Sequence, residues 1–111
     1  MVIPTDVDGR AIRESDHTRR IAGIFKALGD PTRIALLHLL SYGELNVGEL
    51  ARAIGSEDSI SAVSHHLRVL RTARLVRNRR EGKQIYYAIE DQFVVSQLNE
   101  VLTRVQGVGR S

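Results

Sequence analysis

Residues 61–90 read "SAVSHHLRVLRTARLVRNRREGKQIYYAIE", and the spacing of the apolar residues changes within this stretch. As far as about Thr72, apolar side chains recur every three or four residues, which is the period of a helix with one buried face. From Arg74 onwards, apolar and polar residues alternate on both sides of a central "EGK". The stretch therefore predicts a helix followed by a β-hairpin with a basic tip.

The residues before this stretch predict a second, shorter helix. "NVGELARAIG", residues 46–55, begins with Asn46 and has Glu49 three residues later, which is the spacing of a capping box, and Gly55 closes it. The longer helix then begins somewhere in "SEDS", residues 56–59. A short helix, a tight turn, a longer helix and a two-stranded hairpin form the layout of a winged helix-turn-helix.

Further helices are predicted on both sides of this unit. One runs from about Ala11 to Leu28, and "GDPTR", residues 29–33, separates it from a helix over residues 31–42, with Asp30 as the cap and Pro31 in the first turn. A last helix covers "DQFVVSQLNEVLTRVQ", residues 91–106, with an apolar stripe of Val94, Leu98, Val101 and Val105. We therefore expect a mainly α fold of about five helices with a hairpin wing: a flexible arm over residues 1–10, a domain over 11–106 and a short tail over 107–111.

The composition of the chain and the distribution of its charges limit the classes of function that it can have. The 111 residues include no cysteine, which excludes disulfides and thiolate metal sites, and no apolar run is long enough to span a bilayer, so we expect a cytoplasmic protein without a membrane partner. The net charge is only +3, but residues 68–83 hold seven Arg or Lys and one acid, Glu81. Such a cluster is typical of a phosphate-binding surface, although a solvated charged face is the simpler alternative.

The adjacent histidines of the longer helix raise three possibilities: a metal site, a catalytic pair or a nucleic-acid surface. At about 100° per residue, the core side of that helix holds Ile60, Val63, Leu67 and Leu70, and the opposite side holds Ser61, His65, Arg68 and Thr72. His65 and His66 therefore diverge and have no ligand or acid at helical spacing, so neither chelation nor catalysis fits, and we expect no enzyme. An exposed strip of Ser, His and Arg suits close approach to DNA.

Four segments in order resemble the ArsR/SmtB family of bacterial winged-helix repressors: "ALGDPTRIALLHLL", "ELNVGELARAIG", "SAVSHHLRVLRTARLV" and "RREGKQIYYAIED". The resemblance implies a homodimer whose first and last helices form the interface, which assigns Val94, Leu98, Val101 and Val105 to that interface. It also implies a recognition helix in the major groove, with Ser61, Ser64 and His65 as contacts, and a wing on the DNA backbone. From the helical face we add Arg68, and from the wing Arg79, Arg80 and Lys83.

The sensing motifs of the family are altered. Asn46 and Gly48 stand where many members have thiolates, and in a second site Asp91 is kept while Phe93, Arg104 and Gly107 replace the other ligands. A two-residue lengthening, within "GSEDSISAVSHH" at residues 55–66, precedes the recognition helix. Two alternatives stay open for the effector: no metal at all, with control by a partner protein or another ligand, or a non-standard site for Ni, Co or Zn that uses His17. We expect His38 to be a half-buried packing residue with a local hydrogen bond.

The sequence thus predicts a sequence-specific DNA-binding regulator, a repressor that acts as a homodimer on an inverted-repeat operator. The rival interpretation is a protein-interaction module that kept the fold but lost DNA binding. The basic wing and the Ser/His/Arg strip argue against it, because an interaction module needs neither. A nuclease or hydrolase lacks a plausible cluster of metal-binding carboxylates.

Overall fold

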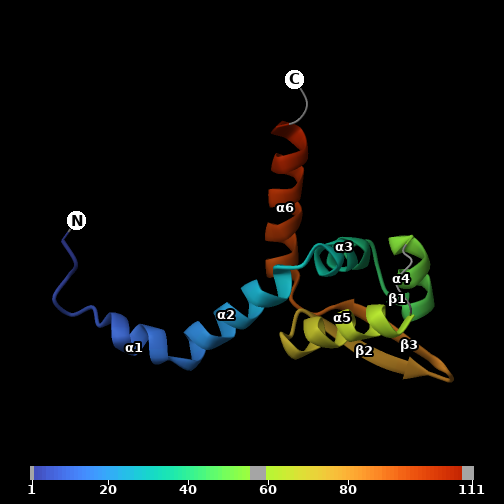
Figure 1. Ribbon diagram of the computed structural model, residues 1–111, viewed down its shortest axis with the longest axis horizontal. Helices are drawn as coiled ribbons and strands as arrows, with labels where there is room; N and C mark the ends of the chain where they lie inside the picture. The colour runs from blue at the N-terminus through green and yellow to red at the C-terminus, as the bar shows by residue number, and fades with distance from the viewer. Residues whose placement is uncertain (1, 56–59, 109–111) are drawn as a thin grey trace.

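The computed structural model of the chain describes residues 2–55 and 60–108. The elements in these residues are α1 (Gly9–Glu14), α2 (Asp16–Leu28), α3 (Pro31–Leu40), β1 (Leu45–Asn46), α4 (Val47–Ile54), α5 (Ile60–Thr72), β2 (Val76–Glu81), β3 (Gln84–Ile89) and α6 (Gln92–Val108). The molecule measures 56 × 42 × 23 Å, because α1 and α2 extend away from the body on one side and α6 projects from it on another (Figure 1).

The predicted continuous helix from Ala11 to Leu28 is wrong, because the chain breaks at Ser15. This residue is extended, with φ −69° and ψ 149°, and its hydroxyl accepts a hydrogen bond from the Thr18 N–H at 3.1 Å, so it caps α2. The preceding helix, α1, begins at Gly9, inside the segment predicted as a flexible arm, and Asp8 caps it. The described chain therefore holds six helices where about five were predicted.

The start of α3 is as predicted. Asp30 is the N-cap, its carboxylate accepts the Arg33 N–H at 3.1 Å, and Pro31 occupies the first turn. That hydrogen bond is the largest influence that lowers the pKa of Asp30 below its ordinary value; partial desolvation opposes it, and the nearby His66 and Arg33 side chains add to the lowering. The cap thus fixes the point at which the chain turns from α2 into α3.

Replacing Asp30 with alanine should lower the free energy of unfolding by about 1 kcal/mol, because one N–H of the first turn of α3 loses its partner. The native pKa is depressed, so this contribution is present above the ordinary value of 3.8 and is lost as the pH falls below it. Urea unfolding at pH 7 and at pH 3 measures both effects. Asp30→Ser keeps a capping oxygen and is the matched control; an equal loss for serine and alanine would contradict the capping role.

The capping box of α4 is confirmed. The Asn46 side chain accepts the Glu49 N–H at 2.8 Å, and the Glu49 carboxylate accepts the Asn46 N–H at 3.0 Å. Gly55 ends α4 with φ 62°, a left-handed conformation that glycine adopts without strain. The predicted start of the longer helix and part of the two-residue lengthening fall on residues 56–59 and lie outside the described residues.

The hairpin is confirmed and belongs to a three-stranded antiparallel sheet in the order β1-β3-β2. Glu81 pairs with Gln84, which leaves a two-residue turn in which Gly82 has φ 60°. The sequence did not predict β1, whose two residues pair with Tyr86 and Tyr87 of β3. The pairing joins the wing to the residue that caps α4.

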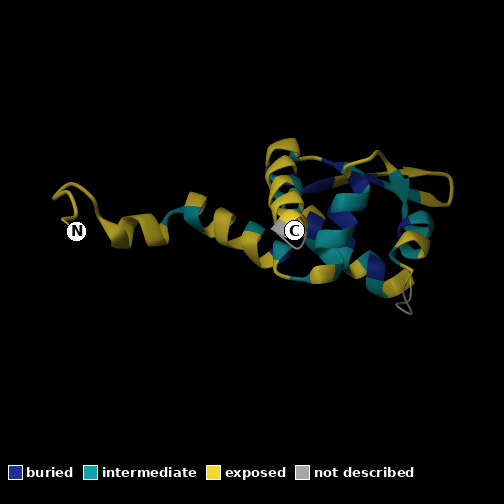
Figure 2. Cartoon of the chain, turned by 90° about the horizontal axis from the view of Figure 1, so that it is seen from above, coloured by how far each residue is buried: buried dark blue, intermediate teal, exposed yellow. Residues whose placement is uncertain are grey.

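The core lies where α3, α4, α5, the sheet and the first half of α6 meet, whereas α1 and most of α2 are exposed (Figure 2). Val63, Leu67 and Leu70 of α5 are fully buried, as predicted, but Ile60 is 60% exposed. Ile60 is the first described residue of α5 and lies beyond the edge of the core. His38 is half-buried, as predicted, but its Nδ1 lies 3.1 Å from Asn99 Oδ1 of α6, so its hydrogen bond is long-range rather than local.

Candidate nucleic-acid interface

The exposed side of α5 carries the predicted strip. Because Val63, Leu67 and Leu70 are buried, the helix is fixed in rotation, and its opposite face is turned to solvent. On that face Ser61, His65, Arg68 and Thr72 are exposed, and Ser64 is half-buried at its edge. A rigid helix with short polar side chains and one arginine on its outer face can enter a DNA groove.

His66 has a different role, which the sequence did not reveal. Its ring is 19% exposed, and its Nδ1 lies 3.2 Å from Arg33 Nη1 and 3.9 Å from Asp30 Oδ2. Arginine can only donate, so Nδ1 accepts the bond. Arg33 also donates from Nε to the Ala27 carbonyl at 2.7 Å. These contacts join α5 to the α2–α3 corner and hold α5 in place.

The cations of the wing divide into two kinds. Arg80 and Lys83 are exposed and form no ion pair with any residue that the structure describes. Arg79 instead donates to Glu44 at 2.6 Å and to Glu81 at 2.6 Å, and its guanidinium lies 4.6 Å from the centre of the Tyr86 ring. The bond to Glu44 contributes most to the raised pKa of Arg79, and it also lowers the pKa of Glu44. The charge of Arg79 is thus largely compensated within the chain.

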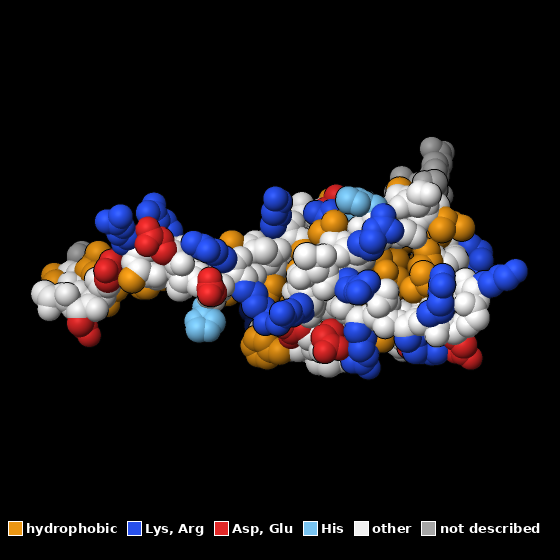
Figure 3. Space-filling view, turned by 90° about the horizontal axis from the view of Figure 1, so that it is seen from below, with side chains coloured by type: hydrophobic (Ala, Val, Ile, Leu, Met, Phe, Trp, Pro, Cys, Tyr) orange, Lys and Arg blue, Asp and Glu red, His pale blue; other side chains and the backbone are white. Residues whose placement is uncertain are grey.

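Lys and Arg side chains spread over the face of the molecule that carries α5 and the wing (Figure 3). They lie on the wing and across the body, whereas on the arm formed by α1 and α2 they alternate with Asp and Glu side chains. The exposed Ser/His/Arg strip of α5, called the reading strip below, and the two free wing cations, Arg80 and Lys83, therefore lie on a positively charged surface. Positive charge is what binding to a polyanion such as DNA requires.

The residues at the usual sensing positions of the family do not fit a metal. The Asp91 carboxylate accepts the Val94 N–H at 3.0 Å and caps α6, Phe93 offers no ligand, and Arg104 pairs with Glu100 at 3.1 Å. His17 is exposed in the first turn of α2. Residues 2–55 and 60–108 contain no group of three or more His, Asp or Glu that could hold an ion. The nickel, cobalt or zinc site at His17 stays a prediction.

The structure divides the apolar stripe of α6 into two parts. Val94 and Leu98 are half-buried against the protomer's own core, whereas Val101 and Val105 are 57% and 67% exposed on the projecting end of the helix. On α2, Ile21 and Phe25 are also exposed. No helix in the described part of the chain is both long and apolar enough to cross a membrane.

A helix-turn-helix whose second helix exposes a polar strip beside a basic two-stranded wing defines the class of winged-helix DNA-binding proteins. Residues 30–78 match the family model of the bacterial regulatory proteins of the arsR family. The chain is 43% identical over 91 residues to a transcriptional repressor SmtB homolog of Synechocystis, covering 82% of this chain and 67% of that protein. It therefore belongs to the ArsR family of DNA-binding transcriptional regulators.

Two further comparisons agree with this assignment. The chain is 41% identical over 100 residues to the HTH-type transcriptional regulator NmtR of Mycobacterium tuberculosis, covering 86% of this chain and 82% of that protein. A homodimeric winged helix-turn-helix DNA-binding domain from Mycobacterium bovis superposes with a TM-score of 0.73 at 29% identity, covering 94% of this chain and 91% of that one. The winged-helix fold predicted from the sequence is thus confirmed.

Proposed function

We propose that this protein is a transcriptional repressor that binds an inverted-repeat operator as a homodimer. The observation that carries the proposal is the exposed Ser/His/Arg strip of α5, which lies opposite a fully buried face and beside two uncompensated cations of the wing. In such a dimer the two copies of α5 enter successive major grooves about 34 Å apart. The repressor activity named for the Synechocystis relative supports the same direction of control.

The proposed contacts fall into two groups. Ser61, Ser64, His65 and Arg68 face base edges, because they project from the exposed side of α5. Arg80 and Lys83 contact phosphates, because their charges have no partner among the described residues. We assign Arg79 to positioning: its bonds to Glu44 and Glu81 hold the wing in a fixed place, and any phosphate contact would have to compete with them.

The proposed dimer interface uses the exposed apolar residues of α2 and α6. Ile21, Phe25, Val101 and Val105 are each more than half exposed, which is unfavourable in a small monomer but suits a face shared by two copies. The related domain from Mycobacterium bovis is homodimeric, which supports this assembly. Val94 and Leu98 would add only the edges that their own core leaves uncovered.

His65→Ala should weaken operator binding by about 1–3 kcal/mol and leave binding to random duplex DNA nearly unchanged, because it removes a base contact. Lys83→Ala should weaken both alike and reduce the slope of log affinity against log salt, because it removes a phosphate contact. Fluorescence anisotropy with the promoter region of the protein's own gene and with a scrambled duplex measures both effects.

With metal ions excluded from the buffer, His17→Ala is the matched control, since it removes an exposed histidine from α2, away from the exposed face of α5. Normal operator affinity of the His65 variant would show that the reading face is misassigned. If the unmodified protein bound the promoter no better than the scrambled duplex, the repressor function itself would be wrong, and the interaction-module interpretation would replace it.

A further inference from the structure

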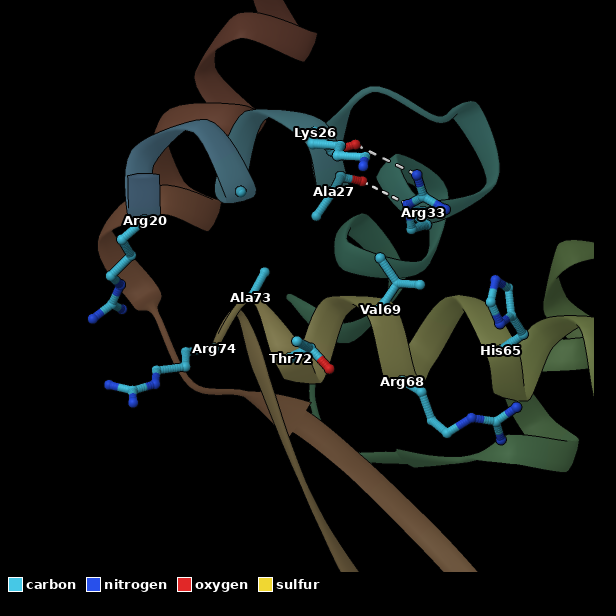
Figure 4. Close-up of a pocket in the computed structure, with 11 residues that line it drawn as sticks. Arg20, Lys26, Ala27, Arg33, His65, Arg68, Val69, Thr72, Ala73 and Arg74 are labelled. Atoms are coloured by element: carbon cyan, nitrogen blue, oxygen red, sulfur yellow. Dashed lines mark hydrogen bonds between the residues drawn. The ribbon is translucent and has the colours of Figure 1, made fainter. Parts of the chain in front are cut away.

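A groove of about 880 Å³ lies between α2 and the recognition helix α5 (Figure 4). Its floor is formed by small or apolar residues, Gly23, Ala27, Val69 and Ala73. Five cations line it: Arg20, Lys26, Arg33, Arg68 and Arg74. The Arg33 guanidinium already donates to the carbonyls of Ala27 and Lys26, which leaves the other four to act on a ligand. Arg20 and Arg74 reach it from different elements, and their guanidinium groups extend on the same side of the molecule (Figure 4). The groove therefore combines an uncharged floor with a positive rim.

These four charges differ from those of Arg77 and Arg79, which have carboxylate partners. Within residues 2–55 and 60–108, none of the four forms an ion pair with a carboxylate. Arg79, by contrast, is held by two carboxylates, and Arg77 pairs with Glu90 at 3.1 Å. Glu90 and Asp91 line a second hollow with Arg20 and Arg74, but Glu90 pairs with Arg77 and the Asp91 carboxylate caps α6. An anion placed among the four cations would therefore lower their mutual repulsion.

The backbone of Arg74 points to a role for its side chain. Arg74 has φ 60°, and it is the one non-glycine residue with positive φ in the described chain. It follows α5 in a Schellman arrangement, with the Arg74 N–H bonded to the Arg71 carbonyl at 2.9 Å and the Leu75 N–H to the Leu70 carbonyl at 3.0 Å. Glycine suits this position best, and any side chain is strained there. Because Arg74 stands at the rim of the groove, its guanidinium is a group to test for ligand binding.

We infer that the groove binds backbone phosphates of the operator near its centre, an extension that rests on the proposed function. His65, Arg68 and Thr72 line the groove and also belong to the reading strip, so the two surfaces are continuous. α2 lies on the side of α5 away from the tip of the wing (Figure 1). Since α2 also carries the proposed dimer residues Ile21 and Phe25, the groove lies towards the dimer axis, between the two half-sites.

The same helix can serve both surfaces. Ile21 and Phe25 are one turn apart on one face of α2, whereas Gly23 and Ala27 are one turn apart on another, at the groove. Dimerisation through the face with Ile21 and Phe25 therefore does not require the face with Gly23 and Ala27, which stays at the groove. Each protomer then contacts DNA at three places: the wing at the outer end of the operator, α5 in the major groove, and the cationic groove nearest the dimer axis.

The test is the double variant Arg20→Ala/Arg74→Gly. Glycine is chosen at position 74 because φ 60° is unstrained for it, so the melting temperature should not fall. A dimer of the variant lacks up to four phosphate contacts, so operator affinity should drop roughly tenfold to a hundredfold and the salt slope should decrease by about 2 to 4. The preference for operator over scrambled duplex should be unchanged. Phosphate-ethylation interference should lose its signals at the centre of the operator and keep those under the wings.

Arg10→Ala/Arg13→Ala is the matched control, since it removes the same charge from α1, outside the groove. The inference is overturned if the groove variant keeps normal affinity and salt slope while the unmodified protein binds its operator, or if the α1 control loses as much. It is also overturned if inorganic phosphate binds the unmodified protein but not the groove variant while DNA affinity is equal in both; the groove would then be a small-anion site. Failure of the unmodified protein to select its operator is a separate result, which removes the proposed function.

Discussion

Replacing Val101 and Val105 together with aspartate should convert the protein to a monomer and abolish operator binding. Both side chains are more than half exposed on the projecting end of α6, so the protomer itself does not need them. In a two-fold interface each replacement counts twice. Four lost apolar contacts of about 1.5–3 kcal/mol each, together with four charges that would have to be buried, exceed what a small interface can tolerate. A monomer would meet only one half-site and lose most of its affinity.

Light scattering gives the mass, and an electrophoretic shift gives the DNA binding. Thr103→Asp is the control, because Thr103 is exposed on the same helix but on the opposite side from Val101 and Val105. Leu98 is a poorer choice, because it packs against the protomer's own core and its replacement would also destabilise the protomer. A double variant that stays dimeric and binds its operator normally would place the interface elsewhere.

Leu67→Ala should have the largest effect on stability, a loss of about 2–5 kcal/mol in the free energy of unfolding. Leu67 is fully buried at the centre of α5, so its truncation leaves a cavity in the core. Whole domains of this size are stable by only about 5–15 kcal/mol, so the variant would be marginal. Urea unfolding at one fixed protein concentration is the measurement, because dimerisation makes the apparent stability depend on concentration.

Arg68→Ala is the natural control for Leu67→Ala. The two residues are neighbours in sequence, but Arg68 is exposed on the outer face of the same helix. Its replacement should change stability by no more than about 0.5 kcal/mol while weakening DNA binding. Similar stability losses for both variants would mean that the rotation of α5 about its axis is misplaced.

Local signals predicted the fold well wherever a residue acts on its near neighbours. The Asp30 cap and the Asn46–Glu49 box are both set within one turn of helix, and both are present as the sequence indicated. Ser15 also caps a helix, but the sequence did not predict this cap. A serine within a helical apolar period can face solvent or bond to its own helix as readily as it can cap a new one. β1 could not be predicted, since two residues become a strand only through pairing with β3.

The candidate site follows the same division. Helical periodicity alone placed Ser61, His65 and Arg68 on one exposed face. It could not show that Arg79 is compensated, because its partner Glu44 lies 35 residues earlier and is brought close only by the fold. The contact of His66 with Arg33, 33 residues apart, was hidden for the same reason. A count of basic residues along the wing therefore overstates its net positive charge, because carboxylates from distant parts of the sequence, such as Glu44, pair with some of them.

Asn46 is the last residue of β1 and also the N-cap of α4, so no loop separates the sheet from the first helix of the helix-turn-helix. In the proposed complex the wing and α5 would therefore keep a fixed spacing, and with it the distance between the phosphates that the wing would contact and the bases that α5 would contact. New side chains on the outer face of α5 would change which bases are preferred, but not how long a half-site is. In the proposed complex, the fold would fix the length of each half-site, and the exposed residues of α5 would determine its base sequence.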